Sequence, residues 1–121
     1  MKRAVIFLVI SLFGATAFAQ EAIRIEDAAK HVGDSVTICT KVFGGRYFEN
    51  GNRQPTLLNA GAKYPDAPLT IVIFGENRAA FSNKPEEFYT GKEVCVTGRI
   101  ILFKEKPEII ITTEAQISIK Q

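Results

Sequence analysis

The stretch EVCVTGRIILFKEKPEIIITT, residues 93–113, contains two apolar, β-branched segments separated by a short charged turn. Residues 93–103 and 107–113 each predict a strand, because β-branched side chains fit the pleated surface of a sheet. Residues 104–106 join the two strands as a turn. Gly98 lies inside the first of them, at a position that suits the sharp bend or bulge a small closed barrel requires.

The segments on the N-terminal side are also short and are separated by turn signals. Residues 35–43 alternate apolar and polar side chains, which predicts a half-buried strand with Thr37, Cys39 and Lys41 on its outer face. The other predicted elements are strands at 56–61 and 67–75, helices at 25–33 and 77–92, and a last apolar pair, Ile117 and Ile119.

This order predicts an all-β protein, a five-stranded Greek-key OB-fold barrel with short helices. The main helix lies between the third and fourth strands, and a second short helix comes before the first strand. The alternative is an open α+β sheet, which would leave β-rich strand edges exposed in the folded protein.

Three segments carry a resemblance to a known family: residues 28–42, 57–81 and 89–117. The turn pattern Asn-x-Gly-x-x-Tyr-Pro and the segment Lys-Pro-Glu-Ile are its most specific parts. Together the segments resemble small bacterial OB-fold domains of nucleic-acid-binding-like character, which occur as exported proteins and attached to secreted nucleases. More distantly, the sequence resembles periplasmic OB-fold stress-tolerance proteins. The resemblance implies the fold more firmly than a function, because OB barrels bind many ligands.

Residues 1–19 have the features of a cleaved signal peptide. Lys2 and Arg3 precede an apolar run at 4–13, and Ala17-Phe18-Ala19 has the small-x-small cleavage pattern. The run is shorter than the roughly 20 residues of a membrane-spanning helix. We therefore expect a periplasmic or secreted protein, with no stable membrane insertion after cleavage and a single OB-fold domain at 20–121.

Charge gives no argument for nucleic acid. The chain has 15 basic and 13 acidic side chains, and without Lys2 and Arg3 the basic count falls to 13. A domain with a net charge near zero has few cations to displace counterions, so binding to nucleic acid should be weak and steeply reduced by salt.

Cys39 and Cys95 are the only cysteines, and export would place them in an oxidising compartment. The first and fourth strands of the predicted barrel are antiparallel neighbours, and alternation puts both cysteines on the outer face. They can form a disulfide if the register places them opposite each other. The alternative is two unpaired thiols that act as small apolar residues.

Three connections supply candidate ligand-binding residues. The loop at 44–55 offers aromatic rings for stacking and arginines for an anionic backbone, and the turn at 103–106 adds a ring and two lysines at the barrel mouth. The turn at 59–68 is interpreted mainly as structural, with Tyr64 packed over the sheet and only weak candidates. The candidates are Arg46, Tyr47, Phe48, Arg53, Asn59, Lys63, Phe103, Lys104 and Lys106. The alternative is that Tyr47 and Phe48 cap the barrel end.

No motif for catalysis, a metal or a cofactor is recognised. His31 is the only histidine, and Glu105 and Glu108 are interpreted as solvated acids around a turn. The predicted function is a non-enzymatic module that binds single-stranded nucleic acid or another anionic oligomer. The alternative is a stress-tolerance or interaction module whose partner is an envelope protein.

Overall fold

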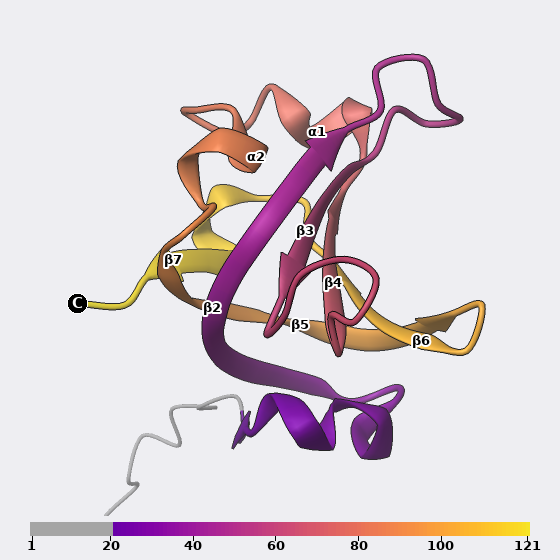
Figure 1. The fold of residues 1–121 in the computed structure, drawn as a ribbon, viewed down its shortest axis with the longest axis vertical. Helices are drawn as coiled ribbons and strands as arrows, with labels where there is room; N and C mark the ends of the chain where they lie inside the picture. The colour runs from indigo at the N-terminus through magenta and orange to yellow at the C-terminus, as the bar shows by residue number, and fades with distance from the viewer. Residues whose placement is uncertain (1–20) are drawn as a thin grey trace, which may run out of the picture.

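Five strands close into a barrel in the computed structural model, which describes residues 21–121 (Figure 1). The elements are β1 (Glu21–Ile23), η1 (Ile25–His31), β2 (Ser35–Tyr47), β3 (Thr56–Ala60), β4 (Leu69–Ile73), α1 (Gly75–Arg78), α2 (Pro85–Phe88), β5 (Glu93–Phe103), β6 (Lys106–Ile110), η2 (Glu114–Gln116) and β7 (Ile117–Ile119). The order β2-β3-β4-β6-β5 returns to β2 through the β2–β5 pairing. This is the OB-fold order, so the predicted fold is confirmed.

The long strand β2 closes the barrel because it has two neighbours in succession. Its first half pairs with β5, from Ser35 opposite Arg99 to Lys41 opposite Glu93. Its second half pairs with β3, after a register shift between Val42 and Gly44. Such a bulge bends a strand and lets β2 turn from one side of the barrel to the other. The strand is longer than predicted and extends to Tyr47, into the segment expected to be a loop.

The core is formed by the inward side chains of all five barrel strands. Val36, Ile38 and Val42 of β2 are fully buried, as the alternation predicted. The other strands contribute the same kind of side chain: Leu58, Ala60, Leu69, Ile71, Ile73, Val94, Val96, Ile100 and Ile109. Because every strand buries one face, a slip of one residue would turn this apolar set toward solvent, so burial holds the register.

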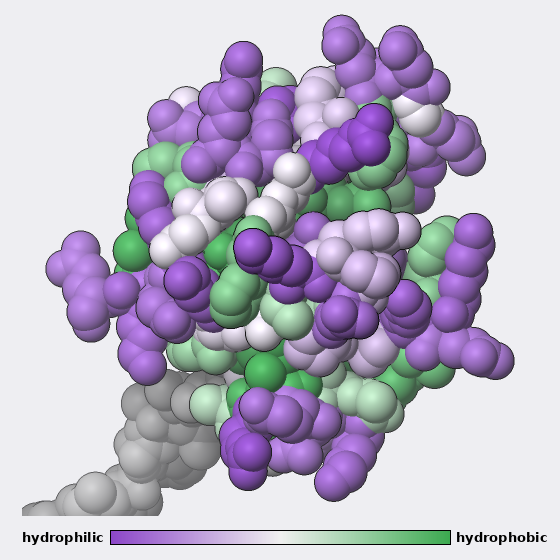
Figure 2. Space-filling model, viewed as in Figure 1, coloured by the Kyte–Doolittle hydropathy of each residue, from purple (hydrophilic) through white to green (hydrophobic). Residues whose placement is uncertain are grey.

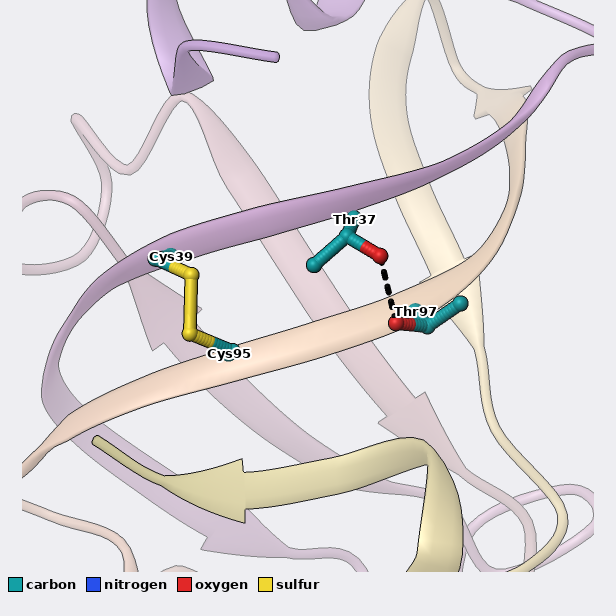
Figure 3. Close-up of a disulfide and its surroundings, with 4 residues drawn as sticks. All are labelled: Thr37, Cys39, Cys95 and Thr97. Carbon is teal, nitrogen blue, oxygen red and sulfur yellow. Dashed lines mark hydrogen bonds between the residues drawn. A yellow bond between two sulfur atoms is a disulfide. The ribbon is translucent and has the colours of Figure 1, made fainter. Parts of the chain in front are cut away.

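Cys39 and Cys95 face each other directly in the β2–β5 pairing and form a disulfide (Figure 3). Their Cα atoms are 4.0 Å apart. On the same face, two positions along each strand, the hydroxyls of Thr37 and Thr97 form a hydrogen bond of 2.7 Å. The predicted strand pairing and outer-face position are therefore confirmed.

Helices close the barrel at both ends: η1 lies at the lower end in Figure 1, and α1 and α2 lie at the upper end. The helix predicted at 77–92 is two single-turn helices, because Pro85 starts α2 and disfavours a helical residue before it. In this segment, Phe81 and Tyr89 are buried in the core and Phe88 packs against it. The predicted packing role of the segment is therefore confirmed.

Gly98 does not mark a bulge, because the β2–β5 register runs through it without a shift. A Cβ atom at this position would lie 2.6 Å from the Cγ2 methyl of Ile109. Ile109 is fully buried and β-branched, so it has little freedom to move aside. The glycine is needed for close packing across the barrel interior.

Two short strands add to the outside of the barrel. β1 pairs in parallel with β2, and β7 pairs antiparallel with β5. The apolar pair Ile117 and Ile119 thus belongs to β7. The predicted signal peptide, residues 1–19, lies outside the described residues. Within 21–121, none of the helices has the length and apolar character needed to cross a membrane.

Candidate ligand-binding groove

An open groove of about 670 Å³ lies on the outer face of β2, β3, β4 and β6. The β5–β6 turn borders it, and the loop at 61–68 contributes Tyr64 to its lining. Figure 2 shows hydrophilic residues along the right-hand edge of the molecule, where β6 and this turn lie in Figure 1, with hydrophobic residues beside them. Apolar and polar side chains both line the groove.

The floor contains one row of polar side chains that crosses three strands. Asn59 of β3 is opposite Thr70 of β4, and Thr70 is opposite Glu108 of β6. Cross-strand neighbours on one face lie about 5 Å apart, so the amide, hydroxyl and carboxylate are adjacent. In the next row Leu57 lines the groove beside Val72.

Three aromatic rings and three cations form the border of the groove. Tyr64 and Phe103 are 80% and 54% exposed, and the Phe48 ring lies 4.8 Å from the guanidinium of Arg46. The three border cations are Arg46, Lys104 and Lys106. Their charge exceeds that of the one floor carboxylate, so the groove is locally positive although the domain has almost no net charge.

Backbone conformation brings part of this border together. Lys104 and Glu105 form the tip of the β5–β6 turn, with φ of 49° and 66°. A two-residue hairpin turn with positive φ at both residues matches the twist of the strands that it joins. Asn-Gly is the common sequence in such turns. The turn makes Phe103 and Lys106 cross-strand partners. A ring and a cation therefore stand side by side at the edge of the groove.

Six of the nine sequence-predicted residues line the groove: Arg46, Phe48, Asn59, Phe103, Lys104 and Lys106. The structure places the other three elsewhere. Lys63 is exposed on the loop at 61–68. Arg53 forms an ion pair with Glu76 and lies 3.8 Å from the centre of the Phe74 ring.

Tyr47 belongs to a partly buried cluster around Arg78. The Arg78 guanidinium lies 3.7 Å from the centre of the Tyr47 ring and donates two hydrogen bonds of 2.8 Å to the Glu86 carboxylate. A third hydrogen bond, 2.7 Å long, goes to the Thr56 hydroxyl. Because β2 continues to residue 47, Tyr47 points to the other face from Arg46 and Phe48. Tyr47 is therefore outside the groove lining.

Sequence reasoning missed Tyr64, Thr70 and Glu108 as groove residues. Tyr64 is exposed at the groove and does not pack over the sheet as expected. The turn pattern that includes Tyr64 was recognised, so a signal for this residue was present. Glu108 lies in β6, within the predicted strand, and lines the groove floor, where it is partly buried and not fully solvated as expected. Partial burial raises the pKa of the Glu108 carboxyl above its usual value.

Among the described residues, the groove lining has no histidine, cysteine or serine. His31 lies in η1, where its Nδ1 atom is 3.2 Å from the Asp34 carboxylate. In the part of the chain that the structure describes, no three His, Cys, Asp or Glu side chains gather as metal ligands would. The arrangement is suited to holding a ligand by stacking, hydrogen bonds and charge.

Comparison with known proteins finds no matching family model and no curated relative. Similar solved structures include an aspartyl-tRNA synthetase from Leishmania major Friedlin (TM-score 0.52, 12% identity) and yeast Stn1 and Ten1 (0.58, 16%). An aspartyl-tRNA synthetase from Entamoeba histolytica is also similar (0.55, 15%). The matches cover 89%, 84% and 83% of this chain but 22%, 63% and 21% of those chains. At these identities the likeness shows a shared OB fold.

Proposed function

We propose that this protein is an exported, non-enzymatic OB-fold module that binds single-stranded nucleic acid weakly through the groove. The observation that carries the proposal is the grouping of three aromatic rings and three cations along one groove. Rings stack on bases of any sequence, and cations attract the phosphates between them. A neutral apolar patch would instead favour a protein partner.

The position of the groove supports the same function. It lies on the barrel face and beside the fourth-to-fifth-strand turn where OB-folds bind oligonucleotides. Two of the similar structures are synthetases whose names specify a tRNA. The signal-peptide features of residues 1–19 and the Cys39–Cys95 disulfide both suit an oxidising compartment outside the cytoplasm.

Removing two groove rings should weaken binding at least tenfold. We expect a Phe48→Ala/Phe103→Ala variant to lose affinity for a labelled mixed-sequence single strand, because stacking contributes about 1–3 kcal/mol per base. Fluorescence anisotropy would measure this. With three cations at phosphates, the slope of log affinity against log salt should be roughly −2 for the unmodified protein.

A matched control is Phe43→Ala. The Phe43 ring also has a cation beside it, because Lys41 Nζ lies 5.2 Å from the ring centre. Phe43 does not line the groove. The affinity of the Phe43→Ala variant for the single strand should stay within twofold of that of the unmodified protein. Absence of binding at low salt, or an equal loss in the control, would overturn the proposal.

An envelope-protein partner is the second candidate, and one observation favours it. Leu102 is 50% exposed next to Phe103 at the end of β5, which gives the β5–β6 turn an apolar side. Such a module would bind a protein partner through the β5–β6 turn. This agrees with the resemblance to stress-tolerance proteins. A Leu102→Ser variant that keeps nucleic-acid affinity but loses an envelope partner would support this candidate.

A further inference from the structure

The polar row on the groove floor has no side-chain partner among residues 21–121. Among residues 21–121, the side chains of Asn59, Thr70 and Glu108 form no hydrogen bond or ion pair with one another or with other side chains. The Glu108 carboxylate is partly buried, and burial alone accounts for its raised pKa. In this open groove the three side chains contact water, and a ligand with complementary donors and acceptors can replace that water.

Only the Glu108 end of the row has a fixed hydrogen-bonding role. The Asn59 amide and the Thr70 hydroxyl can each donate or accept a hydrogen bond. At the other end of the row, the ionised Glu108 side chain only accepts, and its two oxygens can accept side by side. A ligand edge that offers two neighbouring donors to Glu108 and an acceptor to Thr70 or Asn59 is one edge that fits this row.

Among the nucleobases, guanine has this edge. Its Watson–Crick side presents the O6 acceptor, then the N1–H donor, then the N2 amino donor. Cytosine and adenine each present one donor position on that side, while uracil and thymine present a single N–H between two carbonyl oxygens. Protein side chains read the Watson–Crick edges of bases in single strands in this way.

The border of the groove leaves room for the rest of a guanine nucleotide. Tyr64 and Phe103 are exposed rings on which a purine can stack. Arg46, Lys104 and Lys106 can attract the flanking phosphates, whereas the Glu108 carboxylate repels a phosphate from the floor. The charges therefore favour a base pointing into the groove and a backbone along its border.

We infer that the groove selects guanine, with N1–H and the N2 amino group donating to the two oxygens of Glu108 and with O6 accepting from Thr70 or Asn59. This inference rests on the proposed function, because it identifies the base that the single-strand groove prefers. The same edge occurs in a guanine within a strand and in a free guanine nucleotide, and the experiment below separates these two sources.

The test compares labelled thymine-rich oligonucleotides that differ only at one central position, occupied by guanine, hypoxanthine, adenine, cytosine or thymine. We expect guanine to bind at least about fivefold more tightly than thymine, because a good bidentate contact discriminates against the wrong base. Hypoxanthine keeps O6 and N1–H but lacks the amino group, so its affinity should lie between the two.

Glu108→Gln should reduce the guanine preference to less than threefold, since a carboxamide offers one acceptor and one donor. Glu105→Gln is the matched control: it removes the same charge from the neighbouring turn, outside the groove lining. The control should keep the preference. Circular dichroism spectra of both variants would show that each remains folded.

The outcomes separate the two claims. Equal affinity for all five oligonucleotides, or a guanine preference that survives in Glu108→Gln, overturns the inference and leaves the groove a general single-strand site. Failure to bind any oligonucleotide at low salt overturns the proposed function instead. If guanosine monophosphate displaces the guanine oligonucleotide at equal concentration, the ligand is the free nucleotide. If it displaces the oligonucleotide only weakly, the ligand is guanine within a strand.

Discussion

Replacing Cys39 and Cys95 together with alanine is expected to lower the free energy of unfolding by about 4 kcal/mol. The disulfide joins residues 56 positions apart, and a loop of that length restricts the unfolded chain by about this amount in the chain-entropy description. Domains of this size are stable by only about 5–15 kcal/mol. Urea unfolding followed by circular dichroism would measure the difference.

The neighbouring threonine pair supplies the control for this prediction. Thr37 and Thr97 join the same two strands by a hydrogen bond on the same face. Replacing both with alanine removes that bond but no covalent link, so the loss should be about 1 kcal/mol. In the presence of a reductant, the unmodified protein should have the same free energy of unfolding as the cysteine variant. A cysteine variant within 1 kcal/mol of the oxidised protein would contradict the prediction.

Replacing Glu86 with glutamine is expected to lower the free energy of unfolding by about 3 kcal/mol. The Arg78 and Glu86 side chains are 18% and 14% exposed, and a charge left in such a place without its partner is strongly destabilising. The pair also holds α2 against β3 through Thr56. Chemical unfolding at neutral pH would measure the effect.

The acidic neighbour of Glu86 serves as the comparison. Glu87→Gln changes an exposed residue of the same helix, so its unfolding free energy should stay within about 0.5 kcal/mol of the unmodified protein. If both variants unfold alike, the Arg78 cluster does not stabilise the fold as inferred.

The same pair sets the direction of a pH dependence. The hydrogen bonds from Arg78 hold the pKa of Glu86 below its ordinary value. Its stabilisation is therefore complete above the unfolded-state pKa and is lost as the pH falls through the lower folded-state pKa. Unfolding curves recorded between neutral pH and pH 3 should show a smaller acid loss in Glu86→Gln than in the unmodified protein.

The barrel strands and the outer-face position of both cysteines could be predicted because local alternation determines them, whereas the disulfide also depended on the strand register. Alternation in residues 35–43 and 93–103 identified the inward faces of β2 and β5, and this placed Cys39 and Cys95 on one outer face. The short strand β1 carries too few residues for a periodic pattern, and its pairing with β2 is a tertiary contact.

The site was harder to predict because its geometry depends on pairings between distant segments. Gly44 and Gly45 indicated a loop, whereas pairing with β3 extends β2 to Tyr47 and sends that ring to the face opposite Phe48. Similarly, Glu108 reaches the groove floor through the parallel β4–β6 pairing with Thr70. Neither contact leaves a pattern in the sequence around the residue concerned.

The exposure of Tyr64 makes the groove accessible to optical measurement. The chain has three tyrosines and no tryptophan. Tyr89 is buried, and Tyr47 lies beneath the Arg78 guanidinium, so Tyr64 is the phenol most open to quenchers and to nitrating reagents. Changes in intrinsic emission under acrylamide would therefore follow groove occupancy without a label on the protein, and protection of Tyr64 from nitration would map the bound ligand to one side chain.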